Sequence, residues 1–229
     1  MKNPFYLFIL AFLFNSLYSF AQSKTTVYAK GGITIPIGAY SDGMENNEGG
    51  YAKSGSGFGL GVGYDLKHFY RVSLEAQYRT NPASDKKLEE LANSIYPGIT
   101  WKIDAGSYEM TGIMAGFGMY IPETSDMIFG FKAGLGVFNF KTPEFTIRGS
   151  VDGTSESLSE TSDNATSGAF SLEAEIGYRF GKSHSITFNP DFFIAKPEFK
   201  TTNPVDGSSA AYQQEMNSIM LGLRYTYRF

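Results

Sequence analysis

The last eleven residues of the chain alternate between two kinds of side chain. Bulky apolar or aromatic residues fill every second position from Ile219 to Phe229, and glycine, threonine or arginine fill most positions between them. Successive side chains of a β-strand point to opposite faces of the sheet. The pattern therefore predicts a terminal strand with one apolar and one largely polar face.

Seven further stretches show the same two-residue period, each about as long as a membrane-spanning strand of about ten residues. With the terminal stretch, the predicted strands cover residues 26–37, 55–65, 69–79, 108–121, 127–141, 169–180, 185–195 and 219–229. Pro190 interrupts the seventh stretch. Because proline cannot donate a ladder hydrogen bond, we expect a local bulge there.

Short connections between these stretches alternate with long ones. Residues 65–68, 122–126 and 181–184 form the short joins, whereas 38–54, 80–107, 142–168 and 196–217 form the long ones. Short periplasmic turns and long outer loops are typical of barrels in bacterial outer membranes. The sequence therefore predicts an all-β fold, an eight-stranded antiparallel up-and-down transmembrane β-barrel with four long extracellular loops.

The N-terminus has the pattern of a cleavable signal peptide. Lys2 precedes an apolar run from Phe5 to Phe14, and Ser19-Phe20-Ala21 forms a small-x-small cleavage site. The apolar run is much shorter than the roughly 20 residues of a membrane-spanning helix. We therefore expect a signal peptide at 1–21 and a barrel domain at 22–229.

Composition agrees with a membrane barrel. The 26 glycines and the 16% of aromatic residues suit curved strands with aromatic girdles. A net charge of −4 gives no footprint for nucleic-acid binding. The chain has no cysteine, and a closed barrel needs no disulfide.

The environment decides which face of each strand points outward. Lipid offers no hydrogen-bond partner, so only a closed barrel leaves no unpaired strand edge in the membrane. The apolar row then meets lipid and the polar row faces a lumen that side chains of eight strands can fill. Because buried charges need partners, we predict a lumenal network of ion pairs and hydrogen bonds, with at most a narrow pore. Its predicted members are Arg71, Glu75, Arg79, Lys132, Glu173, Glu175, Arg179, Asp191, Arg224 and Arg228, and Lys30 and Gln77 share the same face.

A soluble barrel of the lipocalin kind is the alternative architecture. Its apolar residues would line an internal ligand cavity, and its charged residues would face water. Such a barrel has no reason to place long loops on one rim and minimal turns on the other, or to end on Tyr225, Tyr227 and Phe229. The membrane barrel is therefore favoured.

Residues 221–229, Leu-Gly-Leu-Arg-Tyr-Thr-Tyr-Arg-Phe, carry a resemblance to a known family. With Gly222, Tyr225, Tyr227 and Phe229, they resemble the C-terminal assembly signal of small OmpA/OmpX-like outer-membrane β-barrel proteins, also called the porin family. The resemblance implies the outer membrane of a Gram-negative-type bacterium, contact with outer-membrane lipid, and insertion by the barrel-assembly machinery. It names no extracellular ligand.

No catalytic, cofactor or metal site is expected. His68 and His184 fall in or beside predicted periplasmic turns, away from any serine and carboxylate that could complete a catalytic group. No cluster of histidine, cysteine or acidic residues has the spacing of metal ligands. The sequence therefore favours a non-enzymatic protein.

Two loops have distinct compositions. Residues 142–168 are acidic and rich in serine and threonine, which favours a solvated, mobile loop over a site for a divalent cation or basic partner. Leu88, Leu91 and Ile95 have helical spacing after Ser84 or Asp85, either of which could cap a short amphipathic helix.

Three functions stay open on the sequence alone. The favoured one is a structural or adhesin-like surface protein whose loops contact an unknown extracellular ligand. A narrow porin that passes small solutes is the alternative, and a lipid-modifying barrel enzyme comes third.

Overall fold

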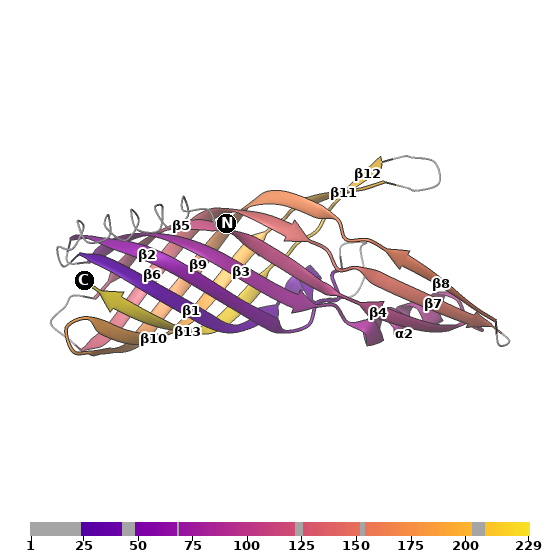
Figure 1. Ribbon diagram of the computed structural model, residues 1–229, viewed down its shortest axis with the longest axis horizontal. Helices are drawn as coiled ribbons and strands as arrows, with labels where there is room; N and C mark the ends of the chain where they lie inside the picture. The colour runs from indigo at the N-terminus through magenta and orange to yellow at the C-terminus, as the bar shows by residue number, and fades with distance from the viewer. Residues whose placement is uncertain (1–23, 43–48, 68, 122–125, 152–153, 203–208) are drawn as a thin grey trace, which may run out of the picture.

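The computed structural model describes residues 24–42, 49–67, 69–121, 126–151, 154–202 and 209–229. Eight strands form a closed antiparallel barrel in the order β1-β13-β10-β9-β6-β5-β3-β2 (Figure 1). They are β1 (Thr25–Pro36), β2 (Gly55–Lys67), β3 (Tyr70–Pro82), β5 (Ser107–Tyr120), β6 (Met127–Lys141), β9 (Asn164–Phe180), β10 (His184–Ala195) and β13 (Ser218–Arg228). The predicted fold class is confirmed, with several strands longer than expected. The signal peptide at 1–21 lies outside the described residues, and the division at residue 21 stays a prediction.

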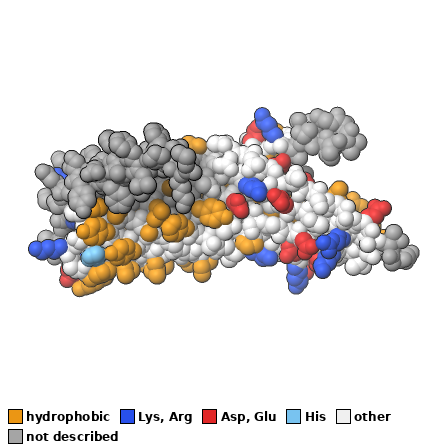
Figure 2. Space-filling model, viewed as in Figure 1, with side chains coloured by type: hydrophobic (Ala, Val, Ile, Leu, Met, Phe, Trp, Pro, Cys, Tyr) orange, Lys and Arg blue, Asp and Glu red, His pale blue; other side chains and the backbone are white. Residues whose placement is uncertain are grey.

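The apolar row of each strand faces outward, as predicted. Phe131 and Leu135 are each 69% exposed and Leu223 is 62% exposed, values that would be costly for a protein surrounded by water. Hydrophobic side chains cover much of the visible barrel wall, whereas lysine, arginine and acidic side chains gather over the part that extends beyond it (Figure 2). The lipocalin-like alternative is therefore wrong, because its apolar row would point inward.

Strands β1 and β13 close the barrel. Their register runs without a shift from Thr26 opposite Arg228 to Pro36 opposite Ser218. The two backbones meet at Gly32 and Gly222, where a Cβ on Gly32 would lie 2.5 Å from the Cα of Gly222. Glycine is required at Gly32 because any side chain would collide with the neighbouring strand.

The expected bulge at Pro190 is wrong. In the pairing of β10 with β9, Phe188 faces Ile176 and Asp191 faces Glu173, so the register is the same before and after the proline. Two residues on each strand separate these pairs, so neither strand carries the extra residue that defines a bulge. A proline removes one donor, and the paired residues on both sides hold the strands in register. The register does shift elsewhere, between Asp65 and Lys67 in β2.

The long connections contain regular structure that the sequence pattern missed. Strands β4 (Thr100–Ala105), β7 (Phe145–Val151) and β8 (Thr154–Glu160) form a three-stranded antiparallel sheet in the order β4-β7-β8, named here the outer sheet. A second pair, β11 (Glu198–Thr202) and β12 (Ser209–Gln213), forms a hairpin. Both extend beyond the barrel at the end opposite the C-terminus (Figure 1).

Residues 142–168, expected to form a solvated, mobile loop, contain regular strands, while residues 155–160 are exposed to solvent as expected. Strands β7 and β8 and the start of β9 occupy most of this segment. The ladder between β4 and β7 satisfies backbone groups that a loop would leave to water, and this pairing joins segments far apart in sequence. Periodicity within one segment could not predict it.

The predicted helix is confirmed as α2 (Asp85–Ile95). Ser84 is its N-cap, and the Ser84 hydroxyl accepts a hydrogen bond from the Lys87 backbone N–H. A short 3-10 helix, η1 (Gly38–Tyr40), follows β1 at the same end of the barrel. Within the described ranges, no helix has the length and apolar character to cross a membrane.

Candidate functional site

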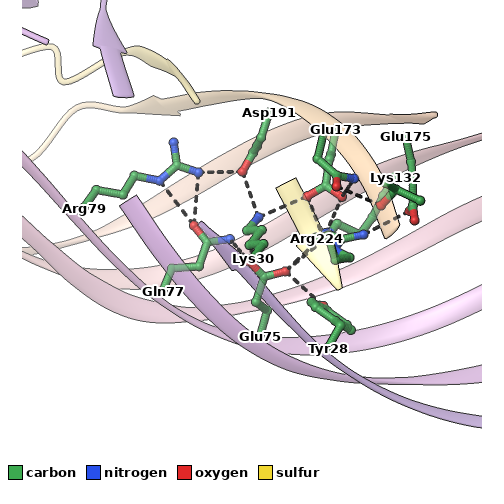
Figure 3. A network of polar contacts seen from close by, with 12 residues as sticks. Tyr28, Lys30, Glu75, Gln77, Arg79, Lys132, Glu173, Glu175, Asp191 and Arg224 are labelled. Atoms are coloured by element: carbon green, nitrogen blue, oxygen red, sulfur yellow. Dashed lines mark hydrogen bonds and ion pairs between the residues drawn. The ribbon is translucent and has the colours of Figure 1, made fainter. Parts of the chain in front are cut away.

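The middle of the barrel interior holds a layer of paired charges, named here the ionic layer (Figure 3). Four cations and four carboxylates from six strands form it: Lys30, Arg79, Lys132 and Arg224 with Glu75, Glu173, Glu175 and Asp191. None of these residues is more than 6% exposed. Their formal charges cancel, which is the arrangement that buried charges require.

The two lysines bridge the carboxylates. The Nζ atom of Lys30 lies 2.6 Å from Glu75 Oε1, 3.1 Å from Glu173 Oε2 and 3.0 Å from Asp191 Oδ2. The Nζ atom of Lys132 lies 3.1 Å from both Glu75 Oε2 and Glu173 Oε2. Glu75 and Glu173 therefore stand at the centre of the layer, each shared by both lysines.

Two arginines extend the layer in opposite directions. Arg224 donates to Glu175 at 3.0 Å and also contacts Glu173, and its guanidinium lies 4.4 Å from the centre of the Tyr28 ring. Arg79 donates to Asp191 at 2.6 Å. The Tyr28 hydroxyl donates to Glu75 at 2.9 Å, which adds a neutral partner to the network.

Strand β2 makes room for these side chains. Its inward positions from Gly57 to Gly63 are glycines, and a Cβ on Gly61 would lie 2.3 Å from the Tyr28 ring. A Cβ on Gly59 would lie 2.7 Å from Glu75 Oε1 and 3.0 Å from Lys30 Cε. Side chains from the two neighbouring strands, β1 and β3, occupy this space, so this part of β2 contributes backbone alone to the interior.

The half of the interior nearer the outer sheet contains a cluster of apolar side chains, named here the apolar layer. Six barrel residues in it are at most 1% exposed: Met110, Met114, Phe138, Phe140, Phe193 and Met220. The rings of Phe138 and Phe193 pack edge to face with centroids 5.1 Å apart. The Arg79 guanidinium lies 4.4 Å from the centre of the Phe193 ring and so joins the ionic layer to the apolar layer.

Three of the predicted network residues lie apart from the ionic layer. Arg71 and Arg228 both pair with Asp65 at the periplasmic end, at 2.6 Å and 3.0 Å. Arg179 lies on β9 at the same end of the barrel. The other seven meet in the ionic layer together with Lys30.

An open cavity of about 200 Å³ lies at the extracellular end of the interior. The Tyr108 hydroxyl, which lines it, donates to the Gly50 carbonyl at 2.8 Å and accepts from the Gln214 amide at 3.2 Å. Burial raises the pKa of Asp163 above its usual range. Burial and the nearby Asp163 carboxylate raise the pKa of Tyr212 to about 12. Both groups line this cavity.

The outer sheet has two edges that differ. Helix α2 covers the β4 edge, where the Glu89 carboxylate accepts from the Ile103 N–H at 3.0 Å and the Asp85 carboxylate accepts from the Ala105 N–H at 2.9 Å. At the other edge, β8 pairs with β7 alone, and its residues from 155 to 160 are exposed. Leu158 is 68% exposed. One edge is therefore capped and the other is open among the described residues.

A family model for the outer membrane protein beta-barrel domain matches residues 7–229. The chain belongs to this family. Comparison with curated protein sequences finds no match.

Solved structures of barrel-family proteins share the fold. The outer membrane protein OprG from Pseudomonas aeruginosa is 12% identical, with 91% of this chain and 98% of that chain covered and a TM-score of 0.53. Neisserial surface protein A is 10% identical, with 90% and 97% covered and a TM-score of 0.50. AlkL, solved in lipid bilayers, is 11% identical, with 91% of each chain covered and a TM-score of 0.50. At these identities the likeness shows the fold alone.

The family places this chain in the outer membrane of a Gram-negative-type bacterium, as predicted. The aromatic C-terminus of this family member lies at the periplasmic end, where the Tyr227 and Phe229 rings are 5.0 Å apart. The role of Gly222, Tyr225, Tyr227 and Phe229 in assembly stays a prediction, as does the barrel-assembly machinery as a partner.

The histidines offer no catalytic group among the described residues. His184 Nδ1 lies 2.6 Å from the Tyr225 hydroxyl, and its ring stacks on Phe180, so it belongs to the aromatic surface of the periplasmic end. His68 lies outside the described residues. In the part of the chain that the structure describes, no group of three or more histidine, cysteine or acidic residues could hold a metal ion.

Sequence reasoning missed two kinds of interior residue in this barrel-family chain. Tyr28 and Asp65 complete the charged clusters, and their inward phase in β1 and β2 was the available signal. The methionines and phenylalanines of the apolar layer also occupy inward positions. The two-residue period indicated that these side chains point inward. The sequence pattern alone, however, did not show that apolar residues on the polar face pack together inside the barrel.

Proposed function

We propose that this protein is a non-enzymatic, non-conducting surface protein that binds an extracellular partner through the open edge of its outer sheet. The main support for a non-conducting barrel is its filled interior, in which an ionic layer and an apolar layer lie one above the other. A solute would have to separate buried ion pairs and then displace packed aromatic rings. Both steps are costly, so the interior supports a structural role.

The outer sheet supports the binding role. An exposed strand edge can pair with an extended segment of another chain, and β8 is such an edge. Its exposed Leu158 stands between Glu156 and Glu160, which share one face of the strand by the two-residue period. A partner strand with basic side chains on either side of an apolar one would match this face in charge. Two copies paired antiparallel about Leu158 would oppose Glu156 and Glu160, which disfavours self-association.

Planar-bilayer recordings test the non-conducting half of the proposal. Folded protein, identified by its heat-modifiable migration on gels, is added to the bilayer, and no stable open steps are expected. Stable steps would instead favour the narrow-porin alternative, because a conducting path would have to pass both layers.

Peptide binding to the protein in nanodiscs tests the binding half. A peptide with lysine, valine and lysine at every second position and threonine between them should bind, whereas the same peptide with glutamate in place of lysine should not. Glu156→Lys should weaken binding severalfold, and Glu144→Lys, an exposed site outside β8, should leave it unchanged. An N-methylated lysine and valine peptide separates strand pairing from charge attraction alone. If it binds as well as its parent, strand addition is ruled out.

A further inference from the structure

A small cavity at the periplasmic end of the barrel is lined mostly by cations. It holds about 40 Å³ and opens toward the turns that join the strands. Arg71, Arg179, Lys182 and Arg228 contribute positive charge to its wall, and Glu175 is the carboxylate in the wall. The volume exceeds the roughly 10–15 Å³ that a single water requires.

In the part of the chain that the structure describes, the cations around this cavity outnumber the nearby carboxylates. Asp65 is shared between Arg71 at 2.6 Å and Arg228 at 3.0 Å. Glu175 is already engaged by Arg224, at 3.0 Å on the ionic-layer side. Asp126, whose backbone carbonyl accepts from the Arg179 N–H at 2.7 Å, is a third acid at this end. Among the described residues the four cations still exceed these three acids, in contrast to the balanced ionic layer above the cavity.

A buried hydroxyl in the same wall gives an independent indication of a ligand. Thr26 lines the cavity and is 1% exposed, and its Oγ1 has no hydrogen-bond partner among the described residues. A Cβ on Gly63 would lie 2.7 Å from this Oγ1 and 2.8 Å from Arg71 Cδ, so the hydroxyl and the Arg71 stem lie side by side. Buried polar atoms are almost always paired, and an orphan donor beside surplus cations indicates a missing acceptor.

We propose that this cavity is a phosphate-binding site, which no part of the proposed function requires. Arginine presents a planar fork of N–H donors that matches phosphate oxygens, and the threonine hydroxyl supplies a further donor. Water alone would satisfy the hydroxyl but would leave the charge surplus. The phosphate has two possible sources with the same chemistry, namely an anionic phospholipid headgroup of the periplasmic leaflet and free inorganic phosphate.

Thermal unfolding of the full chain in uncharged detergent tests the site. Folded and unfolded bands are followed on unboiled gels while inorganic phosphate is titrated against chloride at equal ionic strength. A ligand that binds only the folded state raises the midpoint with its concentration. Phosphate should therefore raise the midpoint of the wild-type protein, and chloride should not. Equal effects of both salts would reduce the observation to charge screening and overturn the proposal.

Three substitutions locate the effect. Arg179→Gln should weaken phosphate binding at least about tenfold, as expected for the loss of one charged hydrogen bond. Arg148→Gln removes the same charge from β7 at the other end of the molecule and should leave the phosphate shift unchanged. Thr26→Val keeps the side-chain shape and should raise the midpoint without phosphate while reducing the phosphate shift. Equal phosphate shifts in wild type and Arg179→Gln would place the ion elsewhere and refute the assignment.

Two measurements keep the test independent of whether a variant folds. ³¹P NMR of the wild-type protein with inorganic phosphate should show a bound, broadened signal, and its absence at millimolar phosphate would exclude free phosphate as the ligand. Nanodiscs of phosphatidylcholine are then compared with nanodiscs containing phosphatidylglycerol. A raised midpoint in the second alone, lost in Arg179→Gln, assigns the site to the headgroup. No phosphate signal together with no lipid effect leaves the cavity to water and overturns the proposal.

Discussion

In the ionic layer, the Lys30 ammonium lies within 3.1 Å of three carboxylates. In the apolar layer, by contrast, the Phe138 and Phe193 rings pack edge to face with their centroids 5.1 Å apart. Both layers fill the same cylinder and both are almost fully buried. Ion pairs are directional, and each member depends on a specific partner, while dispersion contacts depend on volume. The two layers should therefore fail in different ways when a side chain is changed.

The largest effect should come from the centre of the ionic layer. Glu173→Gln removes the charge shared by Lys30, Lys132 and Arg224 and should lower the free energy of unfolding by about 3–5 kcal/mol, because it leaves buried cations without a full set of partners. Unfolding in urea, followed by gel migration, measures it. Glu144→Gln, an exposed pair with Lys141, is the control and should change stability by less than about 1 kcal/mol. Equal losses in both would mean that the layer is not cooperative.

The apolar layer should lose stability through empty volume. Phe138→Ala leaves a cavity among packed rings and should cost about 3 kcal/mol or more. Phe131→Ala, on the lipid-facing side of the same strand, is the matched control, because lipid chains can fill the space that it leaves. The same urea titration compares them. A greater loss for Phe131→Ala would contradict the assignment of the inner face.

Replacing tyrosine by phenylalanine should lower stability in the ionic layer but should not lower it near the apolar layer. Tyr28→Phe removes a hydroxyl that donates to Glu75 and should cost about 1.5–3 kcal/mol. Tyr40 is fully buried above the apolar layer, and its hydroxyl has no hydrogen-bond partner among the described residues. Tyr40→Phe should be neutral or stabilising, because it removes a polar atom that burial leaves unsatisfied. Thermal midpoints of the two variants would refute this contrast if they fell equally.

The smallest loss of stability should come from the partly exposed cluster of Asp65, Arg71 and Arg228. The side chains of Asp65, Arg71 and Arg228 are 15–20% exposed, so water and salt reach this cluster. Asp65→Asn should cost about 1 kcal/mol in low salt, and the cost should shrink at high ionic strength. The cost of Glu173→Gln should stay nearly constant over the same salt range. If the stability cost of Asp65→Asn did not change with salt, both clusters would be equally shielded from water.

The barrel could be predicted from the chain because lipid imposes one rule on every strand. Residues such as Phe131 and Leu223 mark the outward row, and the register of β1 with β13 follows from that row. The ionic layer was predictable in type, since charges on the inward row need partners. Which residues pair was not, because Glu173 meets Lys30 and Lys132 across the lumen rather than along a strand.

The outer sheet could not be predicted for a different reason. Strands β4 and β7 pair across a long stretch of sequence, and Trp101 faces Gly149 in their ladder, whereas β7 and β8 follow each other directly. Serine-rich segments such as β8 have low strand propensity and resemble solvated loops. The pairing with β7 and the cover that α2 gives to β4 determine the structure there. Helix α2 was predictable because Ser84 and three spaced apolar residues are local signals.

The bare inner wall of β2 also constrains how this barrel can vary. A methyl group added at Gly61 would overlap the Tyr28 ring, and one at Gly59 would press on Glu75 and Lys30. Any enlargement at these positions must be matched by a shorter side chain on a neighbouring strand. Tyr28 and Gly61 should therefore change together in natural variants. More generally, substitutions in the lumen should covary between positions on neighbouring strands.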